Sequence, residues 1–143
     1  MTDLVLDISE LLLKFYAIFL RKPYATVRVQ YAPQKDRDGK VTRELMAFTI
    51  INESVPVINI QRAWFLSSYN RIVPSTFLDA KMPVKVIKRE KTTFFFPIEE
   101  LKAALNKNVK DNIAEGVVMD EAGRKFSGRV DKKAQAEFAR YTV

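Results

Sequence analysis

Residues 44–66 read ELMAFTIINESVPVINIQRAWFL, and their pattern indicates β structure. Residues 44–52 are apolar on both faces of an extended chain, which is typical of the central strand of a sheet. Residues 52–54 form a polar turn, and residues 56–66 make a second apolar run. One face of that second run carries Ile58, Ile60, Arg62 and Trp64. The stretch therefore predicts two strands joined by a short turn, with Trp64 in the core.

The chain on either side continues this period-two pattern. Further strands are predicted, in chain order, at residues 25–31, 71–77, 84–87, 92–96, 113–119 and 125–130. Polar turns separate them, including a long one at residues 33–40. Short helices are predicted at residues 97–101 and 131–141, the second with Asp131 as its N-cap. About seven short strands with frequent turns favour a mainly β protein, an antiparallel β-sandwich.

Four motifs resemble those of bacterial immunoglobulin-like domains. Residues 48–57 resemble that group's V-x-N-x-G-x-x-P-V turn, although Glu53-Ser54 stands where glycine is usual. Its L-P, F-x-F-P and D-x-x-G-R-x-F segments are similar to residues 82–83, 93–97 and 118–126. Many uncharacterised small bacterial proteins share this layout, an apolar N-terminal helix followed by the sandwich. The resemblance spans about residues 24–130; it implies an immunoglobulin-like sandwich and no particular activity.

The N-terminal segment has helical periodicity instead. Residues 4–20 read LVLDISELLLKFYAIFL, with charged residues confined to one narrow stripe at ~100° per residue. Lys22-Pro23 ends the predicted helix, because a residue that precedes proline avoids helical geometry. We divide the chain into this helix, residues 1–22, and a sandwich domain, residues 23–143. The helix interaction surface is predicted to consist of Leu4, Ile8, Leu11, Leu12, Phe15 and Phe19.

Such a wide apolar surface has to be covered, and three arrangements remain open. A helix over residues 4–20 reaches about 25 Å, slightly less than the ~30 Å hydrocarbon core of a bilayer. Its charged residues Asp7, Glu10 and Lys14 would each cost about 3 kcal/mol near the bilayer centre. The helix can instead lie in the membrane interface, or pack against its own domain or a second copy. Asp3 and the lack of a small-residue cleavage site argue against a secretory signal, so we expect a cytoplasmic protein, attached in the membrane case to the inner face.

The charge distribution predicts where an anionic partner would bind. The net charge is +7, with 10 basic and 8 acidic residues in positions 1–80 (+2) and 14 basic and 9 acidic in positions 81–143 (+5). Residues 85–96, KVIKREKTTFFF, combine cations with aromatic rings, as single-stranded nucleic-acid sites do. The predicted anionic-partner contacts are Lys85, Lys88, Arg89, Lys91, Arg124 and Lys125.

The composition excludes most of the common catalytic mechanisms. The chain has no Cys and no His, which removes thiolate nucleophiles, the commonest general base and the commonest transition-metal ligands. Its paired carboxylates lie at predicted helix starts and turns, and its four glycines form no phosphate-binding loop. We therefore expect no enzyme, no cofactor and no metal. The leading hypothesis is a protein-interaction module, oligomerised or membrane-attached through its N-terminal helix; the alternative is a nucleic-acid-binding accessory protein.

Overall fold

The computed structural model describes residues 12, 22–74, 81–105 and 111–141. This part of the chain contains ten strands and two helices. In chain order the elements are β1 (Ala25–Tyr31), β2 (Gln34–Lys35), β3 (Val41–Arg43), β4 (Leu45–Asn52), β5 (Ile58–Ser67), β6 (Ile72–Pro74), β7 (Val84–Val86), β8 (Lys91–Pro97), α3 (Ile98–Ala104), β9 (Ile113–Asp120), β10 (Lys125–Arg129) and α4 (Lys132–Arg140). The prediction of a mainly β chain with two short helices after residue 96 is confirmed.

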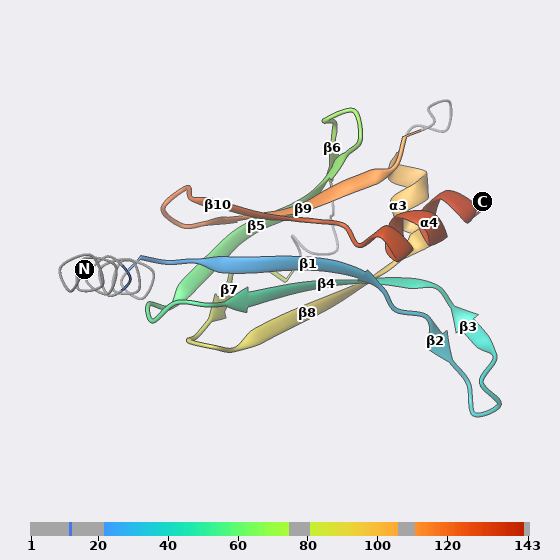
Figure 1. The fold of residues 1–143 in the computed structure, drawn as a ribbon, viewed down its shortest axis with the longest axis horizontal. Coiled ribbons are helices and arrows are strands. Elements are labelled where there is room, and N and C mark those ends of the chain that lie inside the picture. The colour runs from blue at the N-terminus through green and yellow to red at the C-terminus, as the bar shows by residue number, and fades with distance from the viewer. Residues whose placement is uncertain (1–11, 13–21, 75–80, 106–110, 142–143) are drawn as a thin grey trace, which may run out of the picture.

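The strands form two main sheets and a small hairpin. One sheet has the order β1-β4-β8, and the other has the order β10-β9-β5-β6, with β7 also paired to β5. All of these pairings are antiparallel, and β2 and β3 form a separate two-stranded sheet (Figure 1). As predicted, residues 44–52 supply a central strand, since β4 lies between β1 and β8.

The core fills the space between the two sheets. Phe48 of β4 packs edge-on against Phe65 of β5 at 5.3 Å between ring centroids, and Phe65 packs the same way against Phe96 of β8 at 5.5 Å. All three rings are buried, each contributing about 1.5–3 kcal/mol through burial alone. Among the described residues, every member of this core lies between Ala25 and Phe138.

Strands β1 and β10 close one long side of the two-sheet domain (Figure 1). Val29 and Val130 form an isolated parallel bridge, and the Asp131 N–H donates to the Val29 carbonyl at 3.0 Å. Gly128 lies so close to β1 that a Cβ atom there would be 1.8 Å from the Val27 carbonyl oxygen. The two sheets therefore meet backbone to backbone, which only a residue without a side chain allows.

Within the predicted turn at 33–40 the structure contains a hairpin. Residues 34–35 and 41–43 pair as β2 and β3 around a tight turn. The Asp36 carboxylate accepts the N–H groups of Asp38 and Lys40, both at 2.9 Å, and Gly39 adopts a positive φ of 79°. The polar composition identified the turn correctly but gave no signal for two strands this short.

The prediction that Trp64 lies in the core is wrong. A bulge between Ile60 and Arg62 places two residues of β5 opposite one of β9, which reverses the alternation of side chains beyond it. Ala63 and Phe65 therefore face the core, while Trp64 is partly exposed on the other face of the sheet. The Lys125 ammonium lies 5.9 Å from the centroid of its ring.

Helix α4 begins where predicted but is held differently. Asp131 occupies the N-cap position, yet its side chain makes no capping hydrogen bond. Side-chain amides fix the helix instead: Asn112 Nδ2 donates to the Gln135 carbonyl and Gln135 Nε2 donates to the Ile113 carbonyl, both at 3.0 Å. Phe138 completes the attachment by lying fully buried in the core.

Candidate interaction surfaces

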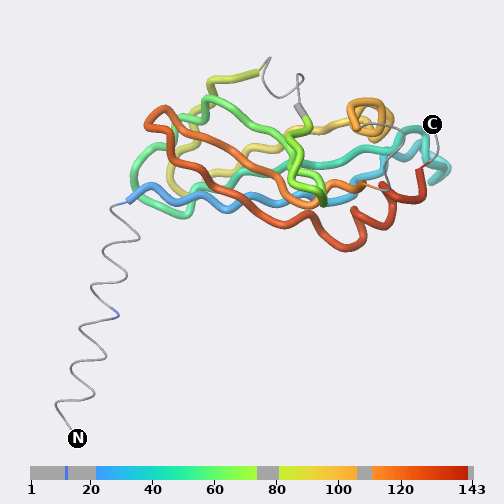
Figure 2. Tube along the Cα trace, turned by 90° about the horizontal axis from the view of Figure 1, so that it is seen from above, coloured from blue at the N-terminus to red at the C-terminus, as the bar shows by residue number. Residues whose placement is uncertain are grey.

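The two ends of the two-sheet domain carry different elements (Figure 1). We call the first the turn end: it consists of residues 22–24, 53–57, 87–91 and 120–125. The opposite end carries the β2–β3 hairpin and both helices, and we call it the helix end (Figure 1). Figure 2, seen from above, shows the same separation along the long axis. Strand β1 starts at the turn end, so the chain enters the domain there.

A buried asparagine holds the turn end together. Asn52 is fully buried, and its Nδ2 donates to the carbonyls of Pro56 and Val86, both at 2.8 Å. Its Oδ1 accepts the Ser54 N–H at 2.8 Å and the Ser54 hydroxyl at 2.6 Å. The Ser54 oxygen in turn accepts the Tyr24 N–H at 3.0 Å. One side chain thus links the β4–β5 turn, the end of β7 and, through Ser54, the start of β1.

The structure brings most of the predicted anionic-partner contacts to the turn end. Lys88 and Arg89 lie in the β7–β8 turn, and Lys91 and Lys125 are the first residues of β8 and β10. All four are exposed, as is Lys85 on β7, which leads into that turn. The sequence separates these residues by up to forty positions, but the fold gathers them at one end.

The sixth predicted contact, Arg124, is engaged within the chain. Its Nε donates to the Asp120 carboxylate at 2.7 Å. Asp120 is buried and also accepts the N–H groups of Ala122 and Arg124, while Gly123 takes a positive φ of 82° to complete the turn. The charge of Arg124 is therefore balanced by Asp120, and this residue contributes little to attracting an anion.

The aromatic run of residues 94–96 is divided between two faces of its strand. Phe94 and Phe96 are buried in the core, whereas Phe95 is 49% exposed. Phe95 borders a groove of about 320 Å³ beside β8, together with Arg43 and Lys81. Two of the three rings that a nucleic acid would use for stacking are consequently unavailable.

The predicted helix interaction surface lies outside the described residues, apart from Leu12. Leu12 is 63% exposed. Leu4, Ile8, Leu11, Phe15 and Phe19 fall in the undescribed segment, so this surface stays a prediction. In the part of the chain that is described, no helix has the length and apolarity needed to cross a membrane.

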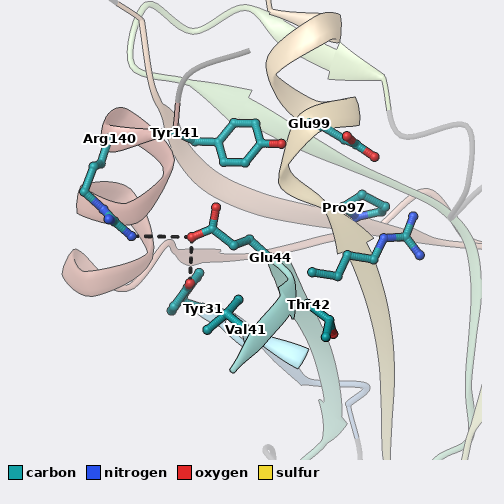
Figure 3. Close-up of a pocket in the computed structure, with 9 residues that line it drawn as sticks. Tyr31, Val41, Thr42, Glu44, Pro97, Glu99, Arg140 and Tyr141 are labelled. Carbon is teal, nitrogen blue, oxygen red and sulfur yellow. Dashed lines mark hydrogen bonds and ion pairs between the residues drawn. The ribbon is translucent and has the colours of Figure 1, made fainter. Parts of the chain in front are cut away.

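A polar groove of about 700 Å³ opens at the helix end (Figure 3). Its walls come from four parts of the chain: the end of β1, strand β3 with Glu44, the β8–α3 junction and the end of α4. The lining residues are Tyr31, Val41, Thr42, Arg43, Glu44, Pro97, Glu99, Arg140 and Tyr141. No sequence motif pointed to this groove, because its residues are spread over more than a hundred positions.

Glu44 organises one side of this groove. Its Oε1 accepts the Tyr31 hydroxyl at 2.8 Å and lies 3.4 Å from a guanidinium nitrogen of Arg140, which also pairs with Glu137 (Figure 3). Burial, with the hydrogen bond to Glu44 and its negative charge, raises the pKa of Tyr31 to about 12. Tyr31 therefore stays protonated and acts as a fixed hydrogen-bond donor in the groove wall.

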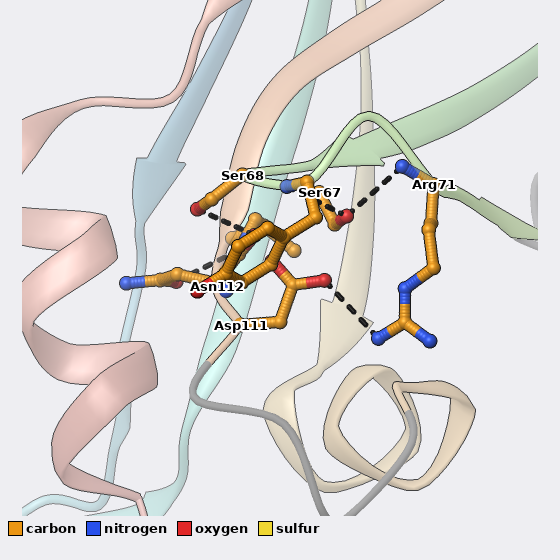
Figure 4. Close-up of polar contacts among 7 residues, drawn as sticks. Ser67, Ser68, Arg71, Asp111 and Asn112 are labelled. Atoms are coloured by element: carbon orange, nitrogen blue, oxygen red, sulfur yellow. Dashed lines mark hydrogen bonds and ion pairs between the residues drawn. The ribbon is translucent and has the colours of Figure 1, made fainter.

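A second polar cluster surrounds Asp111, whose side chain is only 1% exposed (Figure 4). Arg71 donates to Asp111 Oδ2 at 3.2 Å and the Asn112 N–H donates to Oδ1 at 2.9 Å. Burial alone would raise the pKa of Asp111, but hydrogen bonds from the Ser67 hydroxyl, Arg71 and the N–H groups of Asn112 and Tyr69 outweigh it and lower the pKa. The cluster fixes the β5–β6 turn to the start of β9, which is a structural role.

We expect Asp111→Asn to weaken folding at neutral pH. An amide cannot replace a carboxylate that accepts bonds at both oxygens, so the free energy of unfolding should fall by about 1–2 kcal/mol at pH 7. Because the folded-state pKa is lowered, this stabilisation is present above the unfolded pKa of about 3.9 and is lost as pH falls through the folded value. Urea unfolding at pH 7 and below pH 3 measures both effects. Asp131→Asn, at an exposed carboxylate without a capping bond, is the control and should change little.

Metal-ligating side chains do not cluster in the described part of the chain. No three side chains of the metal-ligating types gather within the described ranges. The Ser67 hydroxyl accepts the N–H groups of Tyr69 and Arg71. The fold and these surfaces define a mainly β, antiparallel two-sheet protein. No protein family, curated protein or solved structure matches the chain.

Proposed function

We propose that this chain is a non-catalytic, immunoglobulin-like interaction module, held at a membrane surface by its apolar segment 3–21. The observation that carries the proposal is the placement of the two ends of the domain. The segment joins the domain at the turn end, while the 700 Å³ groove opens at the helix end. A tether at one end leaves the groove and the hairpin beside it free to meet a protein partner.

The strand arrangement supports the immunoglobulin-like part of the proposal. With the β2–β3 hairpin set aside, the first two strands of the chain pair in one sheet together with β8, and β5, β9 and β10 form the other. This resembles constant-type immunoglobulin sandwiches, in which strands A, B, E and D form one sheet and C, F and G the other, although the described first sheet has no counterpart of strand D. Here β6 and β7, which follow β5, both pair with β5 at the edge of the second sheet. The buried aspartate turn at Asp120 and Gly123 corresponds to the D-x-x-G-R motif in the sequence.

The tether is supported by the apolar character of the N-terminal segment. The segment 3–21, predicted to be a helix, carries an apolar surface too wide for a helix with one face in water. A lipid surface, a second copy of the segment or its own domain would cover it, and the composition of the turn end favours lipid.

Light scattering of the full chain, beside a truncation that starts at Tyr24, tests the proposal. We expect the full chain to require mild detergent or to float with lipid vesicles, and the truncation to be a monomer without detergent. If the full chain forms a defined oligomer without detergent and does not bind vesicles, the segment acts in self-association and not as a membrane tether. A full chain that is monomeric and indifferent to lipid would reject both forms of attachment.

The nucleic-acid alternative has weaker support, since Phe94 and Phe96 lie in the core and Arg124 is paired with Asp120. It makes a distinct prediction in the same preparations. Retention on single-stranded nucleic acid at low salt, falling steeply as salt rises, would favour it over the membrane proposal. We expect no such retention by the truncation that starts at Tyr24.

A further inference from the structure

We infer that the turn end docks directly on an anionic lipid bilayer, so that the domain itself, and not only its N-terminal segment, contacts the membrane. This inference rests on the proposed membrane tether and adds the surface that faces the lipid. The docking surface consists of four apolar side chains, Tyr24, Val55, Val57 and Ile87, with the cations Lys22, Lys88, Arg89, Lys91 and Lys125 around them.

The apolar side chains of this surface are partly exposed, and the Tyr24 ring also packs edge-on against Phe126 at 6.4 Å between ring centroids. Tyr24, Val55, Val57 and Ile87 are each between 44% and 48% exposed. They make up four of the nine large hydrophobic side chains that are exposed in the described residues. The other large hydrophobic side chains exposed to this degree or more, in the described residues, are Leu12, Val41, Tyr69, Ile72 and Phe95. Apolar turn residues next to cations are suited to the boundary between lipid headgroups and acyl chains.

The charges at the turn end favour an anionic lipid over a neutral one. It carries five exposed cations and three exposed carboxylates, those of Glu53, Glu90 and Glu121. The Glu121 carboxylate also accepts a hydrogen bond from the Asn59 side chain at 3.0 Å. The buried Asp120 and its partner Arg124 balance each other and leave this excess unchanged. Juxtamembrane lysines and arginines are attracted to anionic headgroups in this way.

Two of the turns, residues 53–57 and 87–91, are fixed relative to each other by Asn52. Asn52 bonds to Pro56 and to Val86, which precedes Ile87. The backbone of Asn52 also pairs with the β7–β8 turn: its N–H donates to the Glu90 carbonyl at 3.1 Å and its carbonyl accepts the Arg89 N–H at 2.9 Å. A surface built on such a framework can bind without first ordering its loops.

A fluorescent probe in the full chain tests the inference, because the chain has no native cysteine to compete for the label. Val55→Cys and Ile87→Cys are labelled with an environment-sensitive dye, and Asp38→Cys in the β2–β3 turn provides the control at the other end. We expect the probes at positions 55 and 87 to brighten with vesicles of phosphatidylcholine and phosphatidylserine, and brominated acyl chains to quench them. The probe at position 38 should not respond.

The possible results separate this inference from the proposed function. If the protein floats with vesicles while the probes at 55 and 87 stay in water, the tether stands and the docking surface is rejected. If the protein does not float at all, the tether fails and the docking surface with it. A probe signal that rises with protein concentration in the absence of vesicles would place a contact between two copies here and overturn the lipid assignment.

Charge variants of the full chain give an independent readout. Lys88→Ala with Lys91→Ala should weaken partitioning onto anionic vesicles by roughly five-fold for each charge removed, an effect that vanishes in high salt. Lys132→Ala with Lys133→Ala removes the same charge from exposed positions on α4 at the helix end and is the matched control. Equal losses for both pairs would show attraction by net charge alone and would reject a defined docking surface.

Discussion

Gly128→Ala is expected to remove about 4 kcal/mol or more of the free energy of unfolding, and to leave the protein largely unfolded if its total stability is ordinary. The added Cβ would lie 1.8 Å from the Val27 carbonyl oxygen and 2.8 Å from the Val27 carbonyl carbon. Both are backbone atoms of β1, so no change of rotamer relieves the contact. Strands β1 and β10 would have to separate, which exposes buried core residues such as Val29. Urea unfolding followed by circular dichroism measures the loss.

Two other glycines provide graded controls for this prediction. A Cβ at Gly39 would meet nothing within 4 Å, but its φ of 79° makes alanine strained, at a cost of about 1–2 kcal/mol. A Cβ at Gly116 would lie 2.7 Å from the ring of Phe48 and 2.8 Å from a methyl group of Val29, side chains that can shift a little. We expect the loss to rise from Gly39 to Gly116 to Gly128. A Gly128→Ala protein as stable as Gly39→Ala would mean that the β1–β10 contact is looser than described.

The strands were predictable because local pattern and tertiary environment agree along most of the chain. The alternation in residues 25–31 matches the burial of β1, where Ala25, Val27 and Val29 face the core. Residues 45–52 could be assigned to a central strand because apolar side chains on both faces are uncommon in an edge strand. Antiparallel pairing follows from short strands joined by short turns.

The errors arose where one extra residue changes the register. The amino-acid sequence of residues 58–64 does not indicate a bulge between Ile60 and Arg62, because this bulge depends on the pairing of β5 with β9. Without it Trp64 would share the face of Ile58, as the alternation predicts. The side-chain bonds that hold α4 likewise depend on Asn112, a residue that the pattern assigns only to a loop.

The candidate surfaces could be predicted only in part for the same reason. A count of charges located the excess of positive charge in the second half of the chain, and the fold places Lys88 and Lys125 at one end. The apolar residues Val55 and Val57 flank a proline in a turn, which is a signal that the sequence did offer. The groove around Glu44 combines distant segments and had no local signal.

Asn52→Ala is expected to lower the free energy of unfolding by about 3 kcal/mol. This loss is larger than the one we expect from the other side-chain truncation, Asn59→Ala. The substitution leaves the carbonyls of Pro56 and Val86 and the Ser54 N–H without their buried partner. Buried polar groups that lose a partner pay most of their desolvation cost. Asn59→Ala is the matched control: within the described residues its side-chain amide bonds to the exposed Glu121, and we expect a change within about 0.5 kcal/mol.

Asn52→Asp separates the hydrogen bonds from the volume of the side chain. The carboxyl keeps an acceptor for Ser54 but turns an oxygen toward the two carbonyls, so the folded state favours its protonated form and raises its pKa. A raised folded-state pKa means that stability is present below the unfolded value of about 3.9 and is lost as pH rises. The difference in the free energy of unfolding between this variant and the native chain should therefore increase from pH 3 to pH 7 in urea unfolding. A difference that does not depend on pH would show that water reaches position 52, and that the asparagine does not hold the three segments of the turn end together.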